Sequence, residues 1–250
     1  MNVLEVRGLT KAYPAFALRD VTFTVPEGAV MGFIGRNGAG KSTTLKSLLG
    51  LVHPDGGEVR FFGKDFAGHE QEIKENIGVV LGGIDFYPKK KVKAITEVTA
   101  RFYPTWDESK YRHYLQLFAI DENKRVDQLS SGMKVKYLIA LALSHDARLL
   151  ILDEPTSGLD PVSRDDLTEL FRALVADGKR SILFSTHITS DLEKCATHIT
   201  YIREGEILCS AEKADFIAAF DHLQQGDEVL TLEEIMVRTE RRGYDESAFA

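Results

Sequence analysis

The chain has 250 residues, a net charge of −7, 44% hydrophobic residues and 28% charged residues. This composition is typical of a globular protein with a substantial core, and the length suits one large domain or one domain with an inserted lobe. The negative charge argues against nucleic acid as the main partner, because neutralising phosphates requires a basic excess. The two cysteines, Cys195 and Cys209, offer neither a disulfide framework nor the spacing of metal ligands.

No segment of the sequence predicts a membrane span or a signal peptide. The first residues, MNVLEVRGLTKAY, lack the basic and apolar regions of a signal peptide. The most apolar helical stretch, YLIALAL at 137–143, is far shorter than the ~20 residues that cross a bilayer. We therefore expect a soluble chain with reduced thiols, which needs a separate membrane partner if it serves a membrane process.

The pattern of apolar residues predicts a mixed α/β fold. Early segments (VLEVRGL, VTFTV, GEVRFFG) predict antiparallel strands. The apolar run at 29–35 predicts a strand, and the continuous apolar runs at 149–153 and 181–185 predict strands that are buried on both faces. Helical periodicity prevails from about residue 92 to 145, and the segments KADFIAAF and LEEIMVRTERRG after about residue 210 also predict helices. We expect an α/β domain with an inserted helical lobe and a peripheral helical tail.

A glycine-rich stretch, GRNGAGKS at residues 35–42, matches the phosphate-loop pattern G-x-x-x-x-G-K-[ST]. Its glycines let backbone N–H groups turn toward phosphate oxygens, and the helix that follows presents its positive N-terminus. Lys41 would reach the β- and γ-phosphates, and the Ser42 hydroxyl would bind Mg²⁺. The predicted nucleotide-binding residues here are Gly35, Arg36, Asn37, Gly38, Ala39, Gly40, Lys41, Ser42 and Thr43.

Two carboxylates and a histidine follow buried strands. Asp153 and Glu154 end the run LLILDEP, where a carboxylate is costly unless a cation or polar group pairs with it. We expect Asp153 to hold Mg²⁺ through water and Glu154 to polarise the attacking water; the alternative is a solvated strand end. His187, in LFSTHIT, is either structural or a contact of a γ-phosphate.

Two further segments have the pattern of helix starts. In LSSGMKVK at 129–136, Ser130 or Ser131 can cap a helix, and Gly132 permits close backbone approach. Taken alone, this segment is only a capped helix. In SGLDP at 157–161, Asp160 is the expected cap and Pro161 the first helical residue.

Taken in order, GRNGAGKST, LSSGMK, LLILDEPTSGLD and STH resemble the nucleotide-binding subunit of an ABC transporter. The resemblance covers most of the chain, from about Val3 to Gly205. It implies a P-loop NTPase core with an N-terminal antiparallel β subdomain and an inserted helical lobe. The nucleotide-binding domain would then span residues 1–210, with its lobe at about 85–145, and a peripheral helical tail would span 211–250.

The resemblance also implies an ATPase that works as a head-to-tail pair of subunits with ATP and Mg²⁺. Ser130 and Gly132 would then contact the γ-phosphate bound by the partner subunit. Tyr13, in LTKAYP, would stack on adenine, although an exposed strand aromatic is the alternative. Asp160 would belong to the loop between subunits, and His187 would be the switch histidine.

The same resemblance assigns Glu154 as the catalytic glutamate and adds Lys41 to the catalytic residues. Three departures from the family pattern are visible. Ser131 replaces the usual glycine of the signature, and Met133 replaces its glutamine. The third lies after the run IGVV, where Leu81, Gly82 and Gly83 replace a glutamine that helps to hold Mg²⁺ in the family. Water could take its place, because Mg²⁺ keeps several waters; Asp85 is the alternative.

The segments FYPTWDESKY, LSSGMK and FSTHI are similar to those of Gram-positive exporter ATPases that handle antibiotics or amphipathic peptides. The implied function is to power a separate integral membrane subunit from the cytoplasmic face of the membrane, in a homo- or heterodimer. The alternatives are a soluble ABC protein of DNA repair or translation and a nucleotide-binding regulator with weak or no hydrolysis. The lysines at 89–91 and Lys93 would face the membrane partner or anionic headgroups, or else form a solvated patch.

Overall fold

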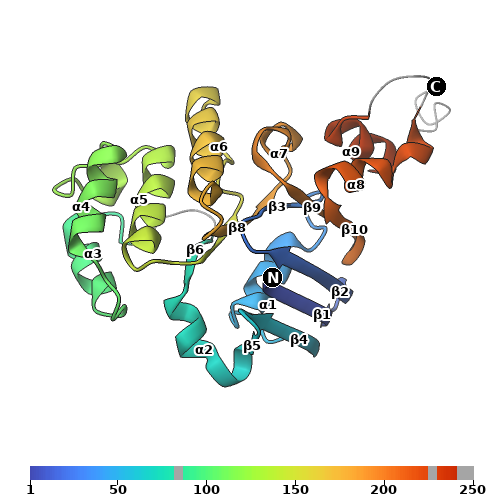
Figure 1. The fold of residues 1–250 in the computed structure, drawn as a ribbon, viewed down its shortest axis with the longest axis horizontal. Coiled ribbons are helices and arrows are strands. Elements are labelled where there is room, and N and C mark those ends of the chain that lie inside the picture. The colour runs from blue at the N-terminus through green and yellow to red at the C-terminus, as the bar shows by residue number, and fades with distance from the viewer. Residues whose placement is uncertain (82–86, 225–229, 241–250) are drawn as a thin grey trace.

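The computed structural model describes residues 1–81, 87–224 and 230–240. A six-stranded sheet lies at its centre, in the order β10-β9-β3-β8-β7-β6 (Figure 1). All neighbouring strands in it are parallel except β10, which pairs antiparallel with β9. The strands are β3 (Val30–Ile34), β6 (Ile77–Leu81), β7 (Leu149–Asp153), β8 (Ser181–Thr186), β9 (His198–Arg203) and β10 (Glu206–Glu212).

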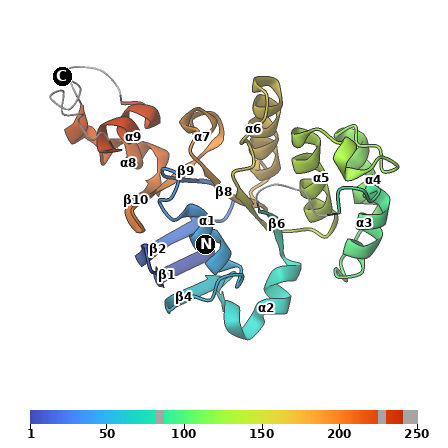
Figure 2. The same cartoon turned by 180° about the vertical axis from the view of Figure 1, so that it is seen from behind.

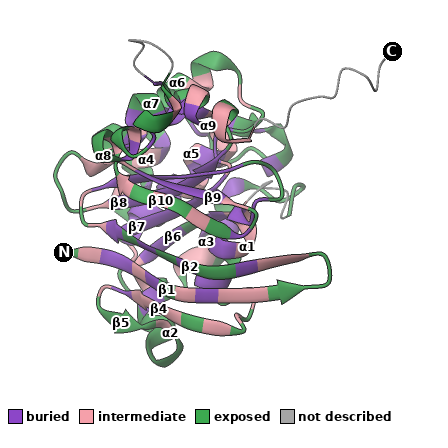
Figure 3. Cartoon of the chain, turned by 90° about the vertical axis from the view of Figure 1, so that its right-hand side faces the viewer, coloured by how far each residue is buried: buried purple, intermediate pink, exposed green. Residues whose placement is uncertain are grey.

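Strands β7 and β8 confirm the sequence prediction of strands buried on both faces, and β3 shares this burial. Every residue of β3, β7 and β8 is buried, which accounts for their uninterrupted apolar runs (Figure 3). Because these three strands are parallel, their carboxyl ends meet at one edge of the sheet. This edge is where ligands bind in open α/β sheets, and the predicted phosphate loop, carboxylates and histidine all follow these strands.

The predicted N-terminal antiparallel sheet is also present. It has the order β2-β1-β4-β5 and packs with helix α1 against the central sheet. Buried apolar residues of β1, β2, α1, β3, β7 and β8 share one core cluster, so the phosphate-loop helix is enclosed between two sheets. These elements are β1 (Asn2–Tyr13), β2 (Phe16–Pro26), β4 (Gly56–Phe61), β5 (Lys64–Asp65) and α1 (Lys41–Leu48).

Three helices at one end of the molecule form the helical lobe (Figures 1 and 2). They are α3 (Val92–Ala100), α4 (Glu108–Leu117) and α5 (Ser131–Ser144), with a 3₁₀ turn at Val126–Gln128. The lobe has its own apolar cluster, while other residues of α5 belong to the core of the central sheet. Helix α5 therefore joins the lobe to the sheet.

The remaining helices cover the central sheet and its edges. They are α2 (Phe66–Glu75), α6 (Pro161–Val175), α7 (Thr189–Cys195), α8 (Lys213–Ala218) and α9 (Leu232–Glu240), with a 3₁₀ turn at Asp221–Leu223. The sequence predicted α8 and α9 as a peripheral tail. Their residues Phe216, Leu232 and Ile235 are almost completely buried and belong to the core cluster of the central sheet. The described part of the tail thus packs into the core.

A buried set of hydroxyl groups links the three helices of the lobe. Thr96 Oγ1 lies 2.8 Å from the Tyr111 hydroxyl and 2.9 Å from the Tyr137 hydroxyl, and Tyr137 also donates to the Val92 carbonyl at 3.2 Å. Burial raises the pKa of Tyr111 to about 12 and also raises the pKa of Tyr137, so both groups keep their protons at neutral pH. The network fixes α3 and α4 against α5, the helix that follows Ser130.

We expect Tyr137→Phe to lower the free energy of unfolding by about 1–2 kcal/mol, because it removes a buried hydroxyl and leaves its partners with one bond fewer. Denaturant titration of the purified chain measures this change. The matched control is Tyr114→Phe, since the Tyr114 hydroxyl makes no hydrogen bond to the residues that the structure describes. Equal losses in the two variants would contradict a stabilising network.

Candidate functional site

The loop at residues 35–40 connects β3 to α1 through backbone conformations that require glycine. Gly40 has φ +115° and Gly38 has φ +83°. A Cβ atom on Gly40 would lie 2.7 Å from Leu18 Cδ2 and 2.9 Å from Phe16 Cζ, whereas a Cβ atom on Gly38 would meet nothing within 4 Å. Both the backbone conformation and the close packing at residue 40 therefore explain why the pattern GRNGAGKS has a glycine there.

Lys41, the first residue of α1, points its ammonium group back into this loop. The side chain is only 5% exposed, and its Nζ donates to the Gly35 carbonyl at 2.7 Å and to the Arg36 carbonyl at 3.3 Å. The third partner of Nζ is Glu154 Oε1, at 3.3 Å. A buried ammonium group is tolerated only with such partners, so the loop, α1 and the end of β7 are held together by one charge.

The two carboxylates that follow β7 are positioned by Ser185 of β8. Ser185 Oγ donates to Asp153 Oδ1 at 2.5 Å and accepts from the Glu154 amide at 2.9 Å. Glu154 has φ +50°, an uncommon conformation for a residue other than glycine. Strained backbone of this kind is concentrated at functional sites. The turn directs the Glu154 side chain into the space above the loop.

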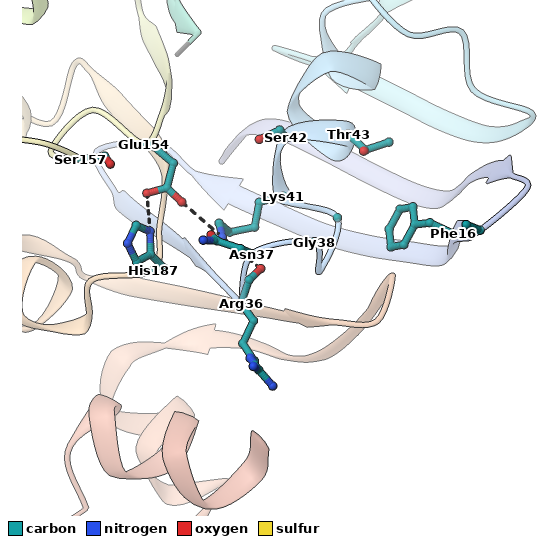
Figure 4. Close-up of a pocket in the computed structure, with 12 residues that line it drawn as sticks. Phe16, Arg36, Asn37, Gly38, Lys41, Ser42, Thr43, Glu154, Ser157 and His187 are labelled. Carbon is teal, nitrogen blue, oxygen red and sulfur yellow. Dashed lines mark hydrogen bonds and ion pairs between the residues drawn. The ribbon is translucent and has the colours of Figure 1, made fainter. Parts of the chain in front are cut away.

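His187 completes a short chain of polar contacts. Its Nδ1 lies 2.9 Å from Glu154 Oε2. Since an ionised carboxylate only accepts hydrogen bonds, this geometry requires the proton on Nδ1. One oxygen of Glu154 thus contacts Lys41 and the other contacts His187, as Figure 4 shows. The arrangement fixes both the position and the orientation of the carboxylate.

These side chains surround a cavity of about 580 Å³. It is lined by Ala15, Phe16, Arg36, Asn37, Gly38, Gly40, Lys41, Ser42, Thr43, Glu154, Ser157 and His187 (Figure 4). The cavity therefore brings together most of the predicted phosphate loop with the predicted glutamate and histidine. Backbone N–H groups at a helix start, a cation and a carboxylate in one cavity can bind a polyphosphate and orient a water beside it.

The two residues predicted to hold Mg²⁺, Ser42 and Asp153, offer oxygen atoms, which that ion prefers. The Ser42 hydroxyl lines the cavity, and Asp153 lies at the end of β7 with a side chain that is almost buried. Its Oδ1 accepts from Ser185, while its Oδ2 makes no hydrogen bond to any residue that the structure describes. The residues present fit a magnesium ion.

The residues predicted at the two helix starts do not line this cavity. Ser130 caps α5 by accepting from the Met133 amide at 3.2 Å, and Gly132 is buried beside Ser163. Asp160 caps α6 by accepting from the amides of Val162 and Ser163, with Pro161 in the first turn. The sequence predictions of these two helix starts are confirmed.

The aromatic residue at the cavity is Phe16, and Tyr13 is not among the residues that line it. The two residues pair across the β1–β2 turn. Tyr13 is 43% exposed and lies beneath the ammonium group of Lys11, 5.8 Å from the ring centroid. Phe16, Ser157 and the supporting Ser185 were missed in the sequence. An aromatic residue beside a predicted turn was the available signal for Phe16, but it did not distinguish Phe16 from Tyr13.

At the place of the missing glutamine, Leu81 ends β6, whereas Gly82 and Gly83 lie outside the described residues, as does the alternative ligand Asp85. The four lysines at 89–91 and 93 are described, and all four are exposed. Among the described residues, no helix is both long enough and apolar enough to cross a membrane.

The fold and the cavity define a P-loop NTPase of the α/β class. Residues 18–157 match the model of the family described as ABC transporter. The bacitracin transport ATP-binding protein BcrA of Bacillus licheniformis is 33% identical over 227 residues, which cover 90% of this chain and 72% of the relative. The Nod factor export ATP-binding protein I of Burkholderia lata is 36% identical over 81% of this chain and 68% of its own length.

Solved structures agree with this family. The structure of an ATP-binding subunit of an ABC transporter has a TM-score of 0.83 and 28% identity, and the match covers 96% of this chain and all of that one. An ATP-binding cassette described as a dimer with bound ADP and phosphate has the same fold, with a TM-score of 0.73, 21% identity and coverage of 84% and 98%. The chain belongs to the ABC transporter family and is one of its ATP-binding ATPase subunits.

We expect Gly40→Ala to lower the free energy of unfolding of the nucleotide-free chain by about 3 kcal/mol. Backbone strain contributes roughly 1–2 kcal/mol of this loss, and overpacking contributes roughly 1–3 kcal/mol. Gly38→Ala should lower it by the backbone strain alone, about 1–2 kcal/mol. Urea titration without nucleotide compares the two variants. Equal losses would mean that contact with Leu18 and Phe16 does not explain the glycine at residue 40.

Proposed function

We propose that this chain is the ATP-hydrolysing subunit of an ABC exporter and drives a separate integral membrane subunit. The observation that carries the proposal is the Glu154 carboxylate, held between Lys41 at 3.3 Å and His187 at 2.9 Å beside the phosphate loop. A general base must be fixed within reach of the proton that it accepts. Glu154 is fixed on both oxygens, at the mouth of a cavity that suits a polyphosphate.

In the proposed reaction, the phosphates of ATP bind the backbone N–H groups of residues 35–40 and the N-terminus of α1. Lys41 exchanges its contact with Glu154 for the β- and γ-phosphates, which frees Glu154 Oε1 to accept a hydrogen bond from the attacking water. His187 donates from Nδ1 to Glu154 Oε2 and keeps the carboxylate in place. Phe16, which lines the cavity, would contact the base, the role that the resemblance implied for Tyr13.

The remaining site residues have proposed roles as well. Mg²⁺ would be held by the Ser42 hydroxyl and, through water, by Asp153, and it supplies positive charge that neutralises the phosphates. Arg36, Asn37, Ala39 and Thr43 belong to the phosphate loop, to which they contribute mainly backbone groups.

A second ABC ATPase subunit, identical or different, completes the proposed site in a head-to-tail pair. Ser130 and Gly132 of each subunit would face the γ-phosphate on the other, and Asp160 would lie in the contact between them. Their positions support this, because all three lie at helix starts and none lines the cavity of its own chain.

The proposed unit for nucleotide binding is residues 1–210, with the helical lobe at about 85–145 and the tail at 211–250. It would work at the cytoplasmic face of the membrane, held there by the membrane subunit. The proposed cargo is an antibiotic or peptide, supported by the bacitracin transport relative; the Nod factor export relatives support the direction of transport.

Replacing Glu154 by Gln should reduce phosphate release at saturating ATP by about 10²–10⁴-fold, the usual contribution of a general base. ATP binding should persist, because the amide is isosteric with the carboxylate and lacks its negative charge. Exposed Glu169→Gln, on α6, is the matched control and should leave turnover unchanged. Wild-type turnover no higher than that of Glu154→Gln, with the membrane partner present, would instead favour a nucleotide-binding regulator.

Purification of the tagged chain from its native membranes in mild detergent should recover an integral membrane protein in a constant ratio to it. Replacing the four lysines at 89–91 and 93 with Gln tests whether this patch contributes, since contact with the partner or anionic headgroups predicts a lower and less salt-dependent recovery. Recovery of the chain without any integral membrane protein would contradict the proposal. Unchanged recovery of the lysine variant would identify a solvated patch.

A further inference from the structure

A nearly buried ion pair joins α6 to α7 outside the cavity. Arg164 Nη2 donates to Asp191 Oδ1 at 2.6 Å and to Ser190 Oγ at 3.2 Å. The Asp191 side chain is 4% exposed and that of Arg164 is 26% exposed. Helices α6 and α7 lie side by side above the central sheet (Figures 1 and 2). Burying charges is costly. Solubility does not explain charged residues at this position, because the pair is largely removed from solvent.

The two residues are attached to two segments with proposed functions. The Arg164 amide donates to the carbonyl of Asp160, the cap of α6, at 3.0 Å. The Asp191 amide donates to the carbonyl of Ile188, the residue after His187, at 3.3 Å. The ion pair therefore connects the Asp160 turn to the His187 turn through about one helical turn on either side.

A guanidinium and a carboxylate can form two parallel N–H···O hydrogen bonds, and Arg164 and Asp191 form only one of them. Arg164 Nε and Asp191 Oδ2 are both buried, and neither has a hydrogen-bond partner among the residues that the structure describes. Nε and Nη2 point to the same side of a guanidinium group, so a small rotation would add a second N–H···O bond parallel to the first. The structure shows the singly bonded arrangement, and a doubly bonded one is open to the same two groups.

We propose that Arg164 and Asp191 are positioning residues that transmit the placement of the Asp160 turn to His187 and, through its hydrogen bond, to Glu154. Coupling between sites needs a physical element with two arrangements that both sites influence. The pair of Arg164 and Asp191, with one hydrogen bond made and a second one available, is such an element. This inference rests on the proposed function, because it assigns to Asp160 the contact with the second subunit.

The test uses the full chain with its membrane partner. Asp191→Asn keeps the shape of the side chain and removes its charge; we expect kcat to fall by about tenfold to a hundredfold, as a misplaced catalytic group predicts. The dissociation constant of ATP, measured separately, should stay within about twofold, because a selective loss of kcat marks an interaction made in the transition state. The matched control is Asp165→Asn, which breaks the exposed pair of Asp165 with Lys194 on the same two helices and should leave kcat unchanged.

Two more variants separate positioning from stability. Asp191→Glu retains the charge and should recover part of the lost kcat. The double variant Arg164→Met/Asp191→Leu replaces the pair with apolar side chains, a change that buried ion pairs often tolerate without loss of stability. We expect denaturant titration to find it as stable as the wild type and kinetic measurements to find the same low kcat as in Asp191→Asn.

Wild-type kcat in a folded Asp191→Asn chain would overturn the inference, as would full recovery of kcat in the double variant, which would make the pair merely structural. Neither result affects the proposed function, which fails only if the wild type has no turnover above that of Glu154→Gln. The two failures are thus distinguished in one series of measurements.

Discussion

The ammonium group of Lys41 is the charge around which the site is built. It is almost completely buried, and its three partners come from the loop carbonyls of Gly35 and Arg36 and from Glu154. Because an unpaired ammonium group would be far too costly in this position, the loop must turn these carbonyls inward. The same constraint favours the left-handed conformation of Glu154, which brings its carboxylate to the lysine. One buried charge thus shapes both sides of the cavity.

The order of the strands determines the distance between those two sides. Strand β8 lies between β3, which leads into the phosphate loop, and β7, which ends in the carboxylates. Its Ser185 pairs with Phe33 of β3 and with Asp153 of β7, and its hydroxyl group bonds both carboxylate residues. The backbone of the phosphate loop is therefore separated from the backbone of the carboxylates by two strand spacings, or about 10 Å. Long polar side chains such as those of Lys41 and Glu154 are needed to meet across it.

Local patterns in the sequence were enough to predict the phosphate loop, the buried strands and the two capped helix starts, because each depends on neighbouring residues. Predictions that depend on packing between distant segments were harder. Tyr13 and Phe16 face each other across one turn, and only the placement of the hairpin against the loop determines that Phe16 lines the cavity. Ser185 has no local signal at all, since a serine at a strand end acquires its role from the neighbouring strands. The burial of Ile235 in the tail likewise depends on the central sheet.

The capping groups of α5 and α6 differ in what they can still offer to a second subunit. The Ser130 oxygen accepts from its own helix, but its proton remains available to donate to a phosphate oxygen. Asp160 is different, because hydrogen bonds from Ser163 and Val162 lower the pKa of its carboxyl group and keep it ionised. An ionised carboxylate repels a phosphate and attracts a cation. In the proposed head-to-tail pair, Ser130 would thus suit direct contact with ATP, whereas Asp160 would suit contact with donors of the other subunit. The hydrogen bond from the Arg164 amide to the Asp160 carbonyl is the first step of the proposed link from that contact to His187.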